Sequence, residues 1–362
     1  MKAAVCHAHG APLTIEDVVL RPPGPGEVRI AVEAVAICHS DIGYLDGIWA
    51  SRLPAVYGHE AAGRILELGA GVQGFQVGDA VVVSMIRACG QCRACRTGKP
   101  FLCAAPYDRG NGVLSLPDGT VVEHGLATGG FAEECVVHAS QIARVPDDLP
   151  MELGALLACG VITGAGAVIH TAQVEPGSTV VVIGAGGVGL NVIQGARLAG
   201  AARVIAIDLA QEKLDAARDF GATDVLRADM KGLRRAVMAL TDGQGADYVF
   251  VAVGAIAAYN QAPSLAGRGG TVVMVGMPPS GARMEIEPVI AAATAQTYRG
   301  SFMGATVVQR DVPYLVEMWR QGRLKLEELI TQRYRFDQIN EAIAEARQGH
   351  VRRNVIIMEK RG

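Results

Sequence analysis

A glycine-rich turn between two apolar runs constrains the fold of this chain more than any other feature. Residues 180–183 are apolar, residues 184–189 read GAGGVG, a segment of helical composition follows, and residues 203–208 form a second apolar run that ends in Asp208. This order is that of a βαβ unit with a dinucleotide fingerprint. A glycine-rich turn alone would also suit other α/β proteins, but the complete order favours a bound dinucleotide.

The glycines of this turn have separate tasks. Gly184 permits the tight turn after the strand, Gly186 lets the backbone approach a pyrophosphate, and Gly189 lets the helix pack closely on the sheet. The helix that follows the turn, at residues 190–198, directs its first N–H groups at the anion. Asp208 suits hydrogen bonds from both ribose hydroxyls and would repel a 2′-phosphate, so the sequence predicts NAD as the cofactor and not NADP.

Length and composition exclude several classes of protein. A chain of 362 residues suffices for about two domains, and half of its residues are apolar. A net charge of −3 without a basic stripe argues against nucleic acid as a partner. The longest apolar stretch, residues 154–169, is short and glycine-rich for a membrane span. Eight cysteines without an apolar signal segment indicate a reducing, cytoplasmic location, where they serve as metal ligands or buried thiols.

Four cysteines are concentrated in one short lobe with the spacing Cys-x2-Cys-x2-Cys-x7-Cys: Cys89, Cys92, Cys95 and Cys103. Four thiolates suit a tetrahedral zinc with no open position, which is a structural site. An iron–sulfur cluster is the competing interpretation. The ferredoxin pattern requires its fourth cysteine after three residues and then a proline, and this lobe has neither.

The rest of the chain divides into two patterns. Residues 28–34 alternate apolar with polar or small side chains, as a half-buried strand does, so the N-terminal part is expected to be rich in β-structure. After Asp208, helical and strand patterns alternate: helices at 211–220, 231–241 and 257–265, and strands at 247–253 and 271–275. Repeated βα units of this length predict a doubly wound parallel sheet.

Three further residues, Cys38, His59 and Cys159, are of the types that hold a catalytic zinc with a free fourth position, although their separation in sequence alone would not assemble them. With them, the chain resembles the zinc-containing medium-chain alcohol dehydrogenases over essentially its full length, and its spacing is closest to the class III-like, mycothiol-linked and aryl alcohol branch. The matching segments are Cys38-His39-Ser40-Asp41, Gly58-His59-Glu60-Ala61-Ala62-Gly63, the four-cysteine lobe, Cys159-Gly160-Val161-Ile162-Thr163-Gly164, and Gly184 to Gly189 with Asp208.

The resemblance implies an α/β architecture in three parts. Residues 1–160 would form a β-rich GroES-like catalytic domain, residues 161–303 a Rossmann domain for NAD, and residues 304–362 a return to the catalytic domain. The active site would lie in the cleft between the domains. The resemblance also implies two zinc ions per chain, a catalytic one and a structural one.

The resemblance also implies a role for each matching residue. Cys38, His59 and Cys159 would hold the catalytic zinc, Asp41 would orient His59, Glu60 would lie behind the metal, and Ser40 would bind the substrate hydroxyl and take its proton. The cofactor residues would be His39 and Arg353 at the pyrophosphate, Asp208 and Lys213 at the adenosine ribose, and Val188 and Thr163 at the nicotinamide. Taken alone, Asp41 and Glu60 also suit helix caps or surface acids, Ser40 a turn, and Arg353 and Lys213 solvated charges.

The match fails at one position. Many family members carry a histidine five positions after the first zinc cysteine, and it passes the proton to solvent; here that residue is Gly43. Without that histidine, the proton from the alcohol is expected to leave through the ribose of the cofactor and water. We therefore expect the pH dependence of hydride transfer to lack a rate-controlling histidine near neutrality.

The residues at the pocket positions indicate the class of substrate and bear on the alternative functions. By resemblance, Trp49, Met85, Met277 and Phe302 face the substrate, and their size and apolar character predict a hydrophobic or aromatic primary alcohol, oxidised reversibly to its aldehyde. Class III enzymes carry an acid at the position of Trp49 and an arginine at that of Tyr107. Because this chain lacks both, the interpretation as a glutathione-adduct formaldehyde dehydrogenase is weakened, while a mycothiol adduct stays an alternative. The alternative of another class is a non-catalytic NAD-binding structural protein, which would be expected to lose zinc ligands.

The long segment at residues 104–130, read as a loop or hairpin, is typical of the dimeric branch of the family. Residues 271–277 are expected to supply the edge strand that joins two Rossmann sheets. The chain is therefore predicted to form a homodimer that acts on small alcohols or aldehydes.

Overall fold

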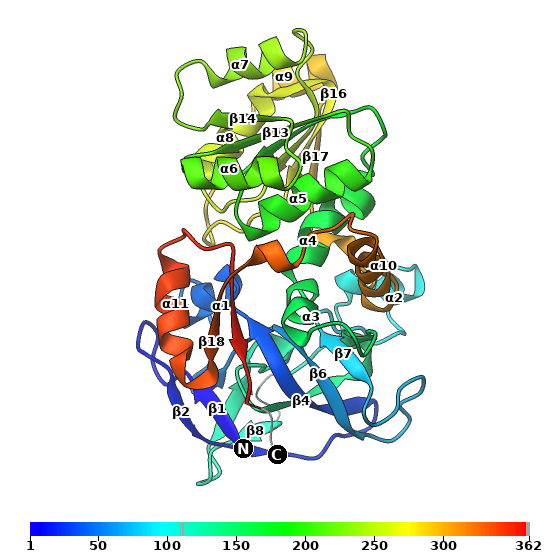
Figure 1. Cartoon of the computed structure of the whole chain (residues 1–362), viewed down its shortest axis with the longest axis vertical. Helices are drawn as coiled ribbons and strands as arrows, with labels where there is room; N and C mark the ends of the chain where they lie inside the picture. Colours follow the sequence, from blue (N-terminus) through cyan, green and yellow to red (C-terminus); the bar gives the residue numbers. More distant parts are fainter. Residues whose placement is uncertain (109, 111, 360–362) are drawn as a thin grey trace. The chain divides into compact units, whose positions relative to one another are not determined.

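The computed structural model describes residues 1–108, 110 and 112–359, which form two compact units (Figure 1). Unit 1 consists of Met1–Gly160 and Val307–Gly362, and unit 2 of Val161–Thr306. The C-terminal segment therefore returns to the unit formed by the N-terminal half. The domain boundary expected at residue 303 falls in a short 3₁₀ turn, Met303–Ala305, just before the end of unit 2.

Unit 1 is built on a seven-stranded sheet with the strand order β11-β7-β6-β4-β19-β18, in which β10 also pairs with β4. Its long strand β4 alternates buried and half-buried residues, because one side faces the core through Val28, Ile30 and Val32. The strands of this sheet are β4 (Glu27–Ala36), β6 (Glu60–Leu68), β7 (Ala80–Val83), β10 (Glu134–His138), β11 (Ile142–Arg144), β18 (Ile330–Arg335) and β19 (Arg353–Ile357).

The C-terminal strand β19 lies between β4 and β18 in this sheet. It runs antiparallel to β4, with Val355 opposite Ala36, and parallel to β18. The helices of the unit are α1 (His39–Leu45), α2 (Arg93–Arg96), α3 (Met151–Leu157), α10 (Val308–Arg320) and α11 (Ile339–Arg347). Helix α3 lies close against β6, since a Cβ atom at Gly154 would be 3.1 Å from the side chain of Ala62.

The segment at residues 104–130 contains a short hairpin, as expected. Strand β8 (Leu114–Ser115) pairs antiparallel with β9 (Val121–His124), and Gly119 closes the turn by donating its N–H to the carbonyl of Leu116. Two small sheets complete unit 1: β1 (Lys2–Val5) with β2 (Thr14–Asp17), and β8 and β9 with β3 (Val19–Leu20) and β5 (Ala55–Val56).

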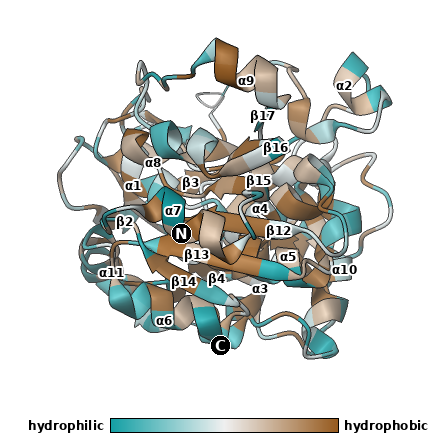
Figure 2. Ribbon diagram, turned by 90° about the horizontal axis from the view of Figure 1, so that it is seen from above, coloured by the Kyte–Doolittle hydropathy of each residue, from teal (hydrophilic) through white to brown (hydrophobic). Residues whose placement is uncertain are grey.

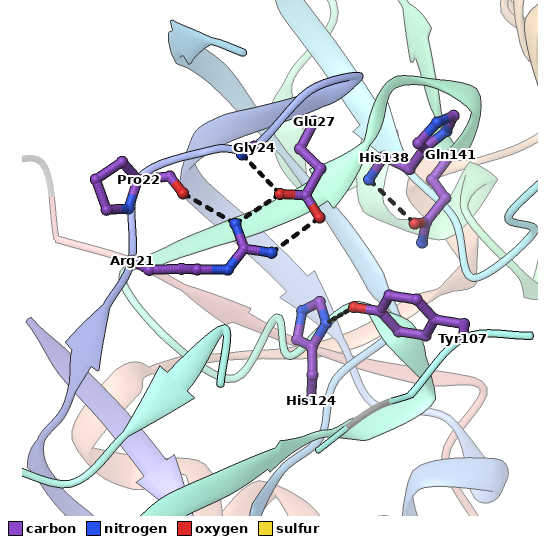
Figure 3. A network of polar contacts seen from close by, with 8 residues as sticks. All are labelled: Arg21, Pro22, Gly24, Glu27, Tyr107, His124, His138 and Gln141. Carbon is purple, nitrogen blue, oxygen red and sulfur yellow. Dashed lines mark hydrogen bonds and ion pairs between the residues drawn. The ribbon is translucent and has the colours of Figure 1, made fainter. Parts of the chain in front are cut away.

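A buried histidine fixes the end of this hairpin (Figure 3). His124 is 1% exposed; its Nδ1 lies 2.7 Å from the hydroxyl of Tyr107 and its Nε2 lies 2.8 Å from the carbonyl oxygen of Thr128. The carbonyl can only accept, so Nε2 carries the proton and Nδ1 accepts from the tyrosine. Burial lowers the pKa of His124 to about 4.

Because the folded chain resists protonation of His124, acid is expected to destabilise unit 1. The unfolded histidine takes up a proton near pH 6.5 and the folded one only near pH 4, so stability falls as the pH drops through this interval, by about 3 kcal/mol in total. We expect His124→Gln to flatten this dependence in denaturant unfolding at pH 7 and 4.5. His9→Gln, at an exposed position, is the control; equal slopes for wild type and His124→Gln would contradict the assignment.

Unit 2 is a six-stranded parallel sheet with the order β14-β13-β12-β15-β16-β17, so the predicted doubly wound sheet is confirmed. Helices α7 and α8 pack on the face that carries Val181 and Ile183, while α5 and α6 lie on the other face (Figure 1). The strands are β12 (Thr179–Ile183), β13 (Arg203–Asp208), β14 (Asp224–Arg227), β15 (Ala246–Val251), β16 (Ala266–Met274) and β17 (Thr297–Gly300). The helices are α5 (Gly187–Leu198), α6 (Gln211–Asp219), α7 (Leu233–Leu240), α8 (Ile256–Gln261) and α9 (Pro288–Thr294).

The prediction that residues 271–277 form an edge strand is wrong. Most of that segment belongs to β16, which is paired on both sides, with β15 and with β17. The two edges of the described sheet are β14 and, next to β16, β17, a strand of mixed composition that no sequence pattern indicates.

Helix α4 (Gly160–Gly166) follows α3, and its chain continues into a π-helical turn, Ala167–Ala172. No single helix among the described residues is long and apolar enough to cross a membrane, although α3 and Gly160–Ala172 together, with a 45° bend, reach that length and composition.

Candidate active site and cofactor turn

Four buried side chains of unit 1 converge on one point. One ligand atom from each of Cys38, His59, Glu60 and Cys159 lies within 4.8 Å of the others. Cys38 is the N-cap of α1, His59 directly precedes β6, and Cys159 lies between α3 and α4. The three expected zinc ligands are thus brought together by three separate elements.

The sheet of unit 1 explains this convergence. Ala36 at the end of β4 is paired with Glu60 at the start of β6, so the chain leaves and enters two neighbouring strands at the same edge. Gly58 fits there with φ +89° and no side chain, because a Cβ atom would lie 2.5 Å from the backbone nitrogen of Phe131. Cys38 and His59 therefore meet although 20 residues separate them in sequence.

Asp41 organises the two ligands. Its fully buried carboxylate accepts hydrogen bonds from the His59 Nδ1 at 2.9 Å, from the Gly58 N–H at 3.0 Å and from the Cys38 N–H at 3.2 Å. The bond to Nδ1 fixes the tautomer of His59 and directs the lone pair of Nε2 into the cluster.

The cluster fits a zinc ion. The Nε2 of His59 is buried and has no hydrogen-bond partner among the described residues, a state that costs free energy unless a ligand binds there. A hydrogen bond from Cys159 holds the pKa of the Cys38 thiol well below its usual value, while the pKa of the Cys159 thiol is raised. Two thiols and an imidazole nitrogen with a free lone pair are the donors of a catalytic zinc site.

Glu60, the fourth member of this cluster, is paired with the buried guanidinium of Arg353. The Arg353 Nε lies 3.4 Å from the Glu60 Oε2, and the two side chains are 6% and 0% exposed. Burial raises the pKa of Glu60 to about 8. Gly160 leaves room for the guanidinium, since a Cβ atom there would be 2.3 Å from the Arg353 Nη2. No local sequence pattern indicates this contact, because β19 reaches β4 only in the folded sheet.

The four-cysteine lobe also forms a cluster. The thiols of Cys89, Cys92, Cys95 and Cys103 lie within 4.8 Å of one another and are half-exposed. The N–H groups of Cys89 and Cys92 donate to the sulfurs of Cys103 and Cys89, both at 3.3 Å. The backbone N–H of Cys95, followed by the neighbouring thiols, lowers the pKa of Cys92 to about 6. Four converging thiols with backbone donors fit a closed, structural metal site.

The glycine turn of unit 2 has the geometry of a dinucleotide site. Gly184 adopts φ +94°, and a Cβ atom at Gly189 would lie 1.8 Å from the carbonyl oxygen of Gly184, so the helix and the strand end approach closely. Beside Gly186, by contrast, no described atom comes within 4 Å of a Cβ position. The first N–H groups of α5, from Gly187 onward, border this space and fit a pyrophosphate.

Asp208 ends β13 next to that turn. Its Oδ2 accepts the N–H of Ala185 at 2.7 Å, and its Oδ1 accepts the N–H of Ala210 at 3.1 Å. These two bonds hold a half-exposed carboxylate beside the glycine turn. That is the position from which an acid recognises ribose hydroxyls in this type of fold.

The other predicted cofactor residues are distributed over both units. In unit 2, Val188 and Lys213 are half-buried, on α5 and α6, and Thr163 is buried with its hydroxyl 3.7 Å from the sulfur of Met303. In unit 1, His39 is exposed at the start of α1 and Arg353 is buried against Glu60.

The predicted substrate residues likewise belong to both units. Ser40, Trp49 and Met85 are half-buried in unit 1. Met277 and Phe302 belong to unit 2 and are 59% and 45% exposed. Cys6 and Cys135, which match no motif, are buried thiols, as expected.

Comparison with known proteins gives the family. Residues 24–147 match the alcohol dehydrogenase GroES-like domain, and residues 187–320 match the zinc-binding dehydrogenase domain. The chain is 37% identical to the NDMA-dependent alcohol dehydrogenase of Amycolatopsis methanolica, with 98% of each chain covered. Among solved structures, it is similar to an alcohol dehydrogenase zinc-binding domain protein from Burkholderia ambifaria (33% identity, TM-score 0.95) and to the benzyl alcohol dehydrogenase of Acinetobacter calcoaceticus (31% identity, TM-score 0.93), with 99% of each chain covered. The chain therefore belongs to the zinc-containing medium-chain alcohol dehydrogenase family and is an oxidoreductase.

Proposed function

We propose that the protein oxidises hydrophobic or aromatic primary alcohols to aldehydes, reversibly, with one catalytic and one structural zinc and with NAD as hydride acceptor. The observation that carries this proposal is the buried cluster of Cys38, His59 and Cys159, in which the Nε2 of His59 lacks a hydrogen-bond partner among the described residues. Three protein donors leave a fourth position of a tetrahedral metal for substrate.

Residues of this chain supply binding and orientation around that position. Zinc, when bound by Cys38, His59 and Cys159, acts as a Lewis acid that lowers the pKa of an alcohol hydroxyl. Asp41 holds the imidazole in the ligating tautomer. Ser40, two residues after Cys38 on α1, is the residue proposed to accept the hydroxyl proton. His39 and Arg353 at the pyrophosphate, Lys213 at the ribose, and Val188 and Thr163 at the nicotinamide remain predictions.

The choice of NAD rests on Asp208. Its carboxylate is fixed by two backbone N–H groups, so it cannot easily move aside for a 2′-phosphate. The choice of an apolar alcohol rests on Trp49, Met85, Met277 and Phe302 and is consistent with the similarity to a benzyl alcohol dehydrogenase. The non-catalytic alternative has less support, because both metal-ligand clusters are complete.

The decisive experiment is steady-state oxidation of benzyl alcohol by the purified protein with NAD, with NADP, and after removal of exchangeable zinc. The proposal requires turnover that depends on NAD and disappears with the metal. Turnover of formaldehyde only after addition of mycothiol or glutathione would assign the protein to the thiol-adduct dehydrogenases instead.

We also propose a homodimer joined through β17 and α9 of unit 2. Strand β17 has one unpaired side among the described strands, and α9 exposes Val289 and Ile290 by 71% and 48%. Figure 2 shows α9 as an apolar ribbon. Exposed apolar side chains beside an open sheet edge are typical of a protein–protein contact.

Ile290→Glu is expected to convert the dimer into a monomer, because it buries a charge in the proposed contact. The molar mass from light scattering would halve. Val121→Glu, at a residue of unit 1 with similar exposure (47%), should leave the mass unchanged. A dimer that survives Ile290→Glu at micromolar concentration would exclude this surface.

A further inference from the structure

We infer that Gly43 is a positioning residue for substrate specificity: the missing side chain seats the indole of Trp49 on helix α1, on the face that carries Ser40. The inference rests on the proposed function and adds to it the residue that sets where one wall of the alcohol pocket lies.

The contact between the two residues leaves no space for a side chain at position 43. A Cβ atom on Gly43 would lie 2.7 Å from the Cζ3, 3.0 Å from the Cε3 and 3.2 Å from the Cη2 of Trp49. Carbon atoms that are not bonded have their optimal separation at about 3.5–4.0 Å. Even a methyl group would therefore displace the six-membered ring of the indole.

Helix geometry places this ring close to the reacting group. Helix α1 begins after Cys38, and Ser40 and Gly43 are three residues apart, so they lie on the same helix face about 5–6 Å from each other. An indole that covers Gly43 is thus a neighbour of the Ser40 hydroxyl. It presents an apolar surface over a residue that lies five positions after Cys38, the N-cap of the same helix.

The indole is held from a second side by an aromatic row. The ring of Tyr44 contacts Trp49 edge to face, with centroids 5.4 Å apart, and stacks on Tyr57 at 5.8 Å. Tyr57 is fully buried, and its hydroxyl lies 2.7 Å from that of Ser51. The row anchors Trp49 to the core, so the position of the ring depends on Gly43 below it and on Tyr44 beside it.

The same contact bears on the position at which related enzymes carry a histidine. Where related enzymes carry a histidine at this position, any such side chain here would occupy the volume of the Trp49 ring. The glycine at position 43 therefore permits the position that the Trp49 ring has in this structure.

A double-mutant cycle with Gly43→Ala, Trp49→Ala and the combined variant tests this inference. With Trp49 present, Gly43→Ala should lower the Tm by about 2 °C or more, and the ratio of kcat/KM for benzyl alcohol to that for ethanol should fall about tenfold. In the Trp49→Ala background the same change should raise the Tm by about 2 °C, because alanine is the better helix residue once the ring is gone. There it should leave the selectivity ratio unchanged.

Two results would overturn the inference. If Gly43→Ala has the same effect on Tm in both backgrounds, the two residues are not coupled. If Gly43→Ala changes the Tm but not the selectivity ratio, Gly43 has only a structural role. Failure of the proposed function would look different, since the wild-type protein would then oxidise neither alcohol while the Tm cycle remained measurable.

Discussion

Cys159→Ala is expected to reduce alcohol oxidation by about 10⁴-fold or more. The variant removes one of three protein donors from the buried cluster, and a Lewis acid contributes several kcal/mol to such a reaction, with about 1.4 kcal/mol for each factor of ten. Metal analysis should show loss of one zinc per chain, and the four-cysteine lobe should keep the other. The second readout reports on the site independently of turnover.

Cys135→Ala is the matched control for this experiment. Cys135 is also a buried thiol of unit 1, on β10, and burial raises its pKa to about 12, so it remains an unreactive thiol. Both substitutions remove one sulfur atom from the interior, and their cost in stability should be similar. Full zinc content and near-normal turnover in Cys159→Ala would refute its role as a ligand.

Asp208→Ala should change the preference between NAD and NADP by about 10³-fold. The variant loses charge-assisted hydrogen bonds to the ribose, each worth about 1.5–3 kcal/mol, so kcat/KM for NAD should fall about 10²-fold. It also removes the repulsion of a 2′-phosphate, so the value for NADP should rise. The N–H of Ala185 loses its acceptor, which gives the phosphate a donor at the edge of the glycine turn.

Asp215→Ala controls for the loss of a negative charge on this side of the sheet. Asp215 lies on α6, its side chain is 60% exposed, and it pairs with Arg218. Initial rates with both cofactors at fixed ionic strength give the comparison. An unchanged cofactor ratio in Asp208→Ala, or an equal change in Asp215→Ala, would contradict the assigned role of Asp208.

Local sequence patterns were sufficient for much of the fold. Residues 180–208 contain strand, turn, helix and acid in uninterrupted order, and the structure forms β12, α5 and β13 from them. The spacing of the four-cysteine lobe is equally local, and its thiols converge. In such segments the interacting residues are neighbours in the chain, so their spacing carries the information.

Contacts between distant segments were not predictable in this way. Nothing near Arg353 in the sequence indicates that it faces Glu60, because the pairing of β19 with β4 brings the two together. The expected edge strand at residues 271–277 was wrong for the same reason: strand order decides which strand lies at the edge. The seat of Trp49 on Gly43 also depends on a fold of the loop after α1 that no short pattern encodes.

The position of β19 inside the sheet of unit 1 has a consequence for the order of folding. Unit 2 is a continuous segment, so it can fold as soon as residues 161–306 have left the ribosome. The sheet that holds the Cys38–His59–Cys159 cluster, in contrast, ends at residues 34–36 of β4 on one side until residues 353–357 have been synthesised, because β19 is the strand that pairs there. During translation, this part of β4 therefore stays an unpaired edge, and β18 cannot join the sheet before its partner β19 exists, while the nucleotide-binding unit is already complete.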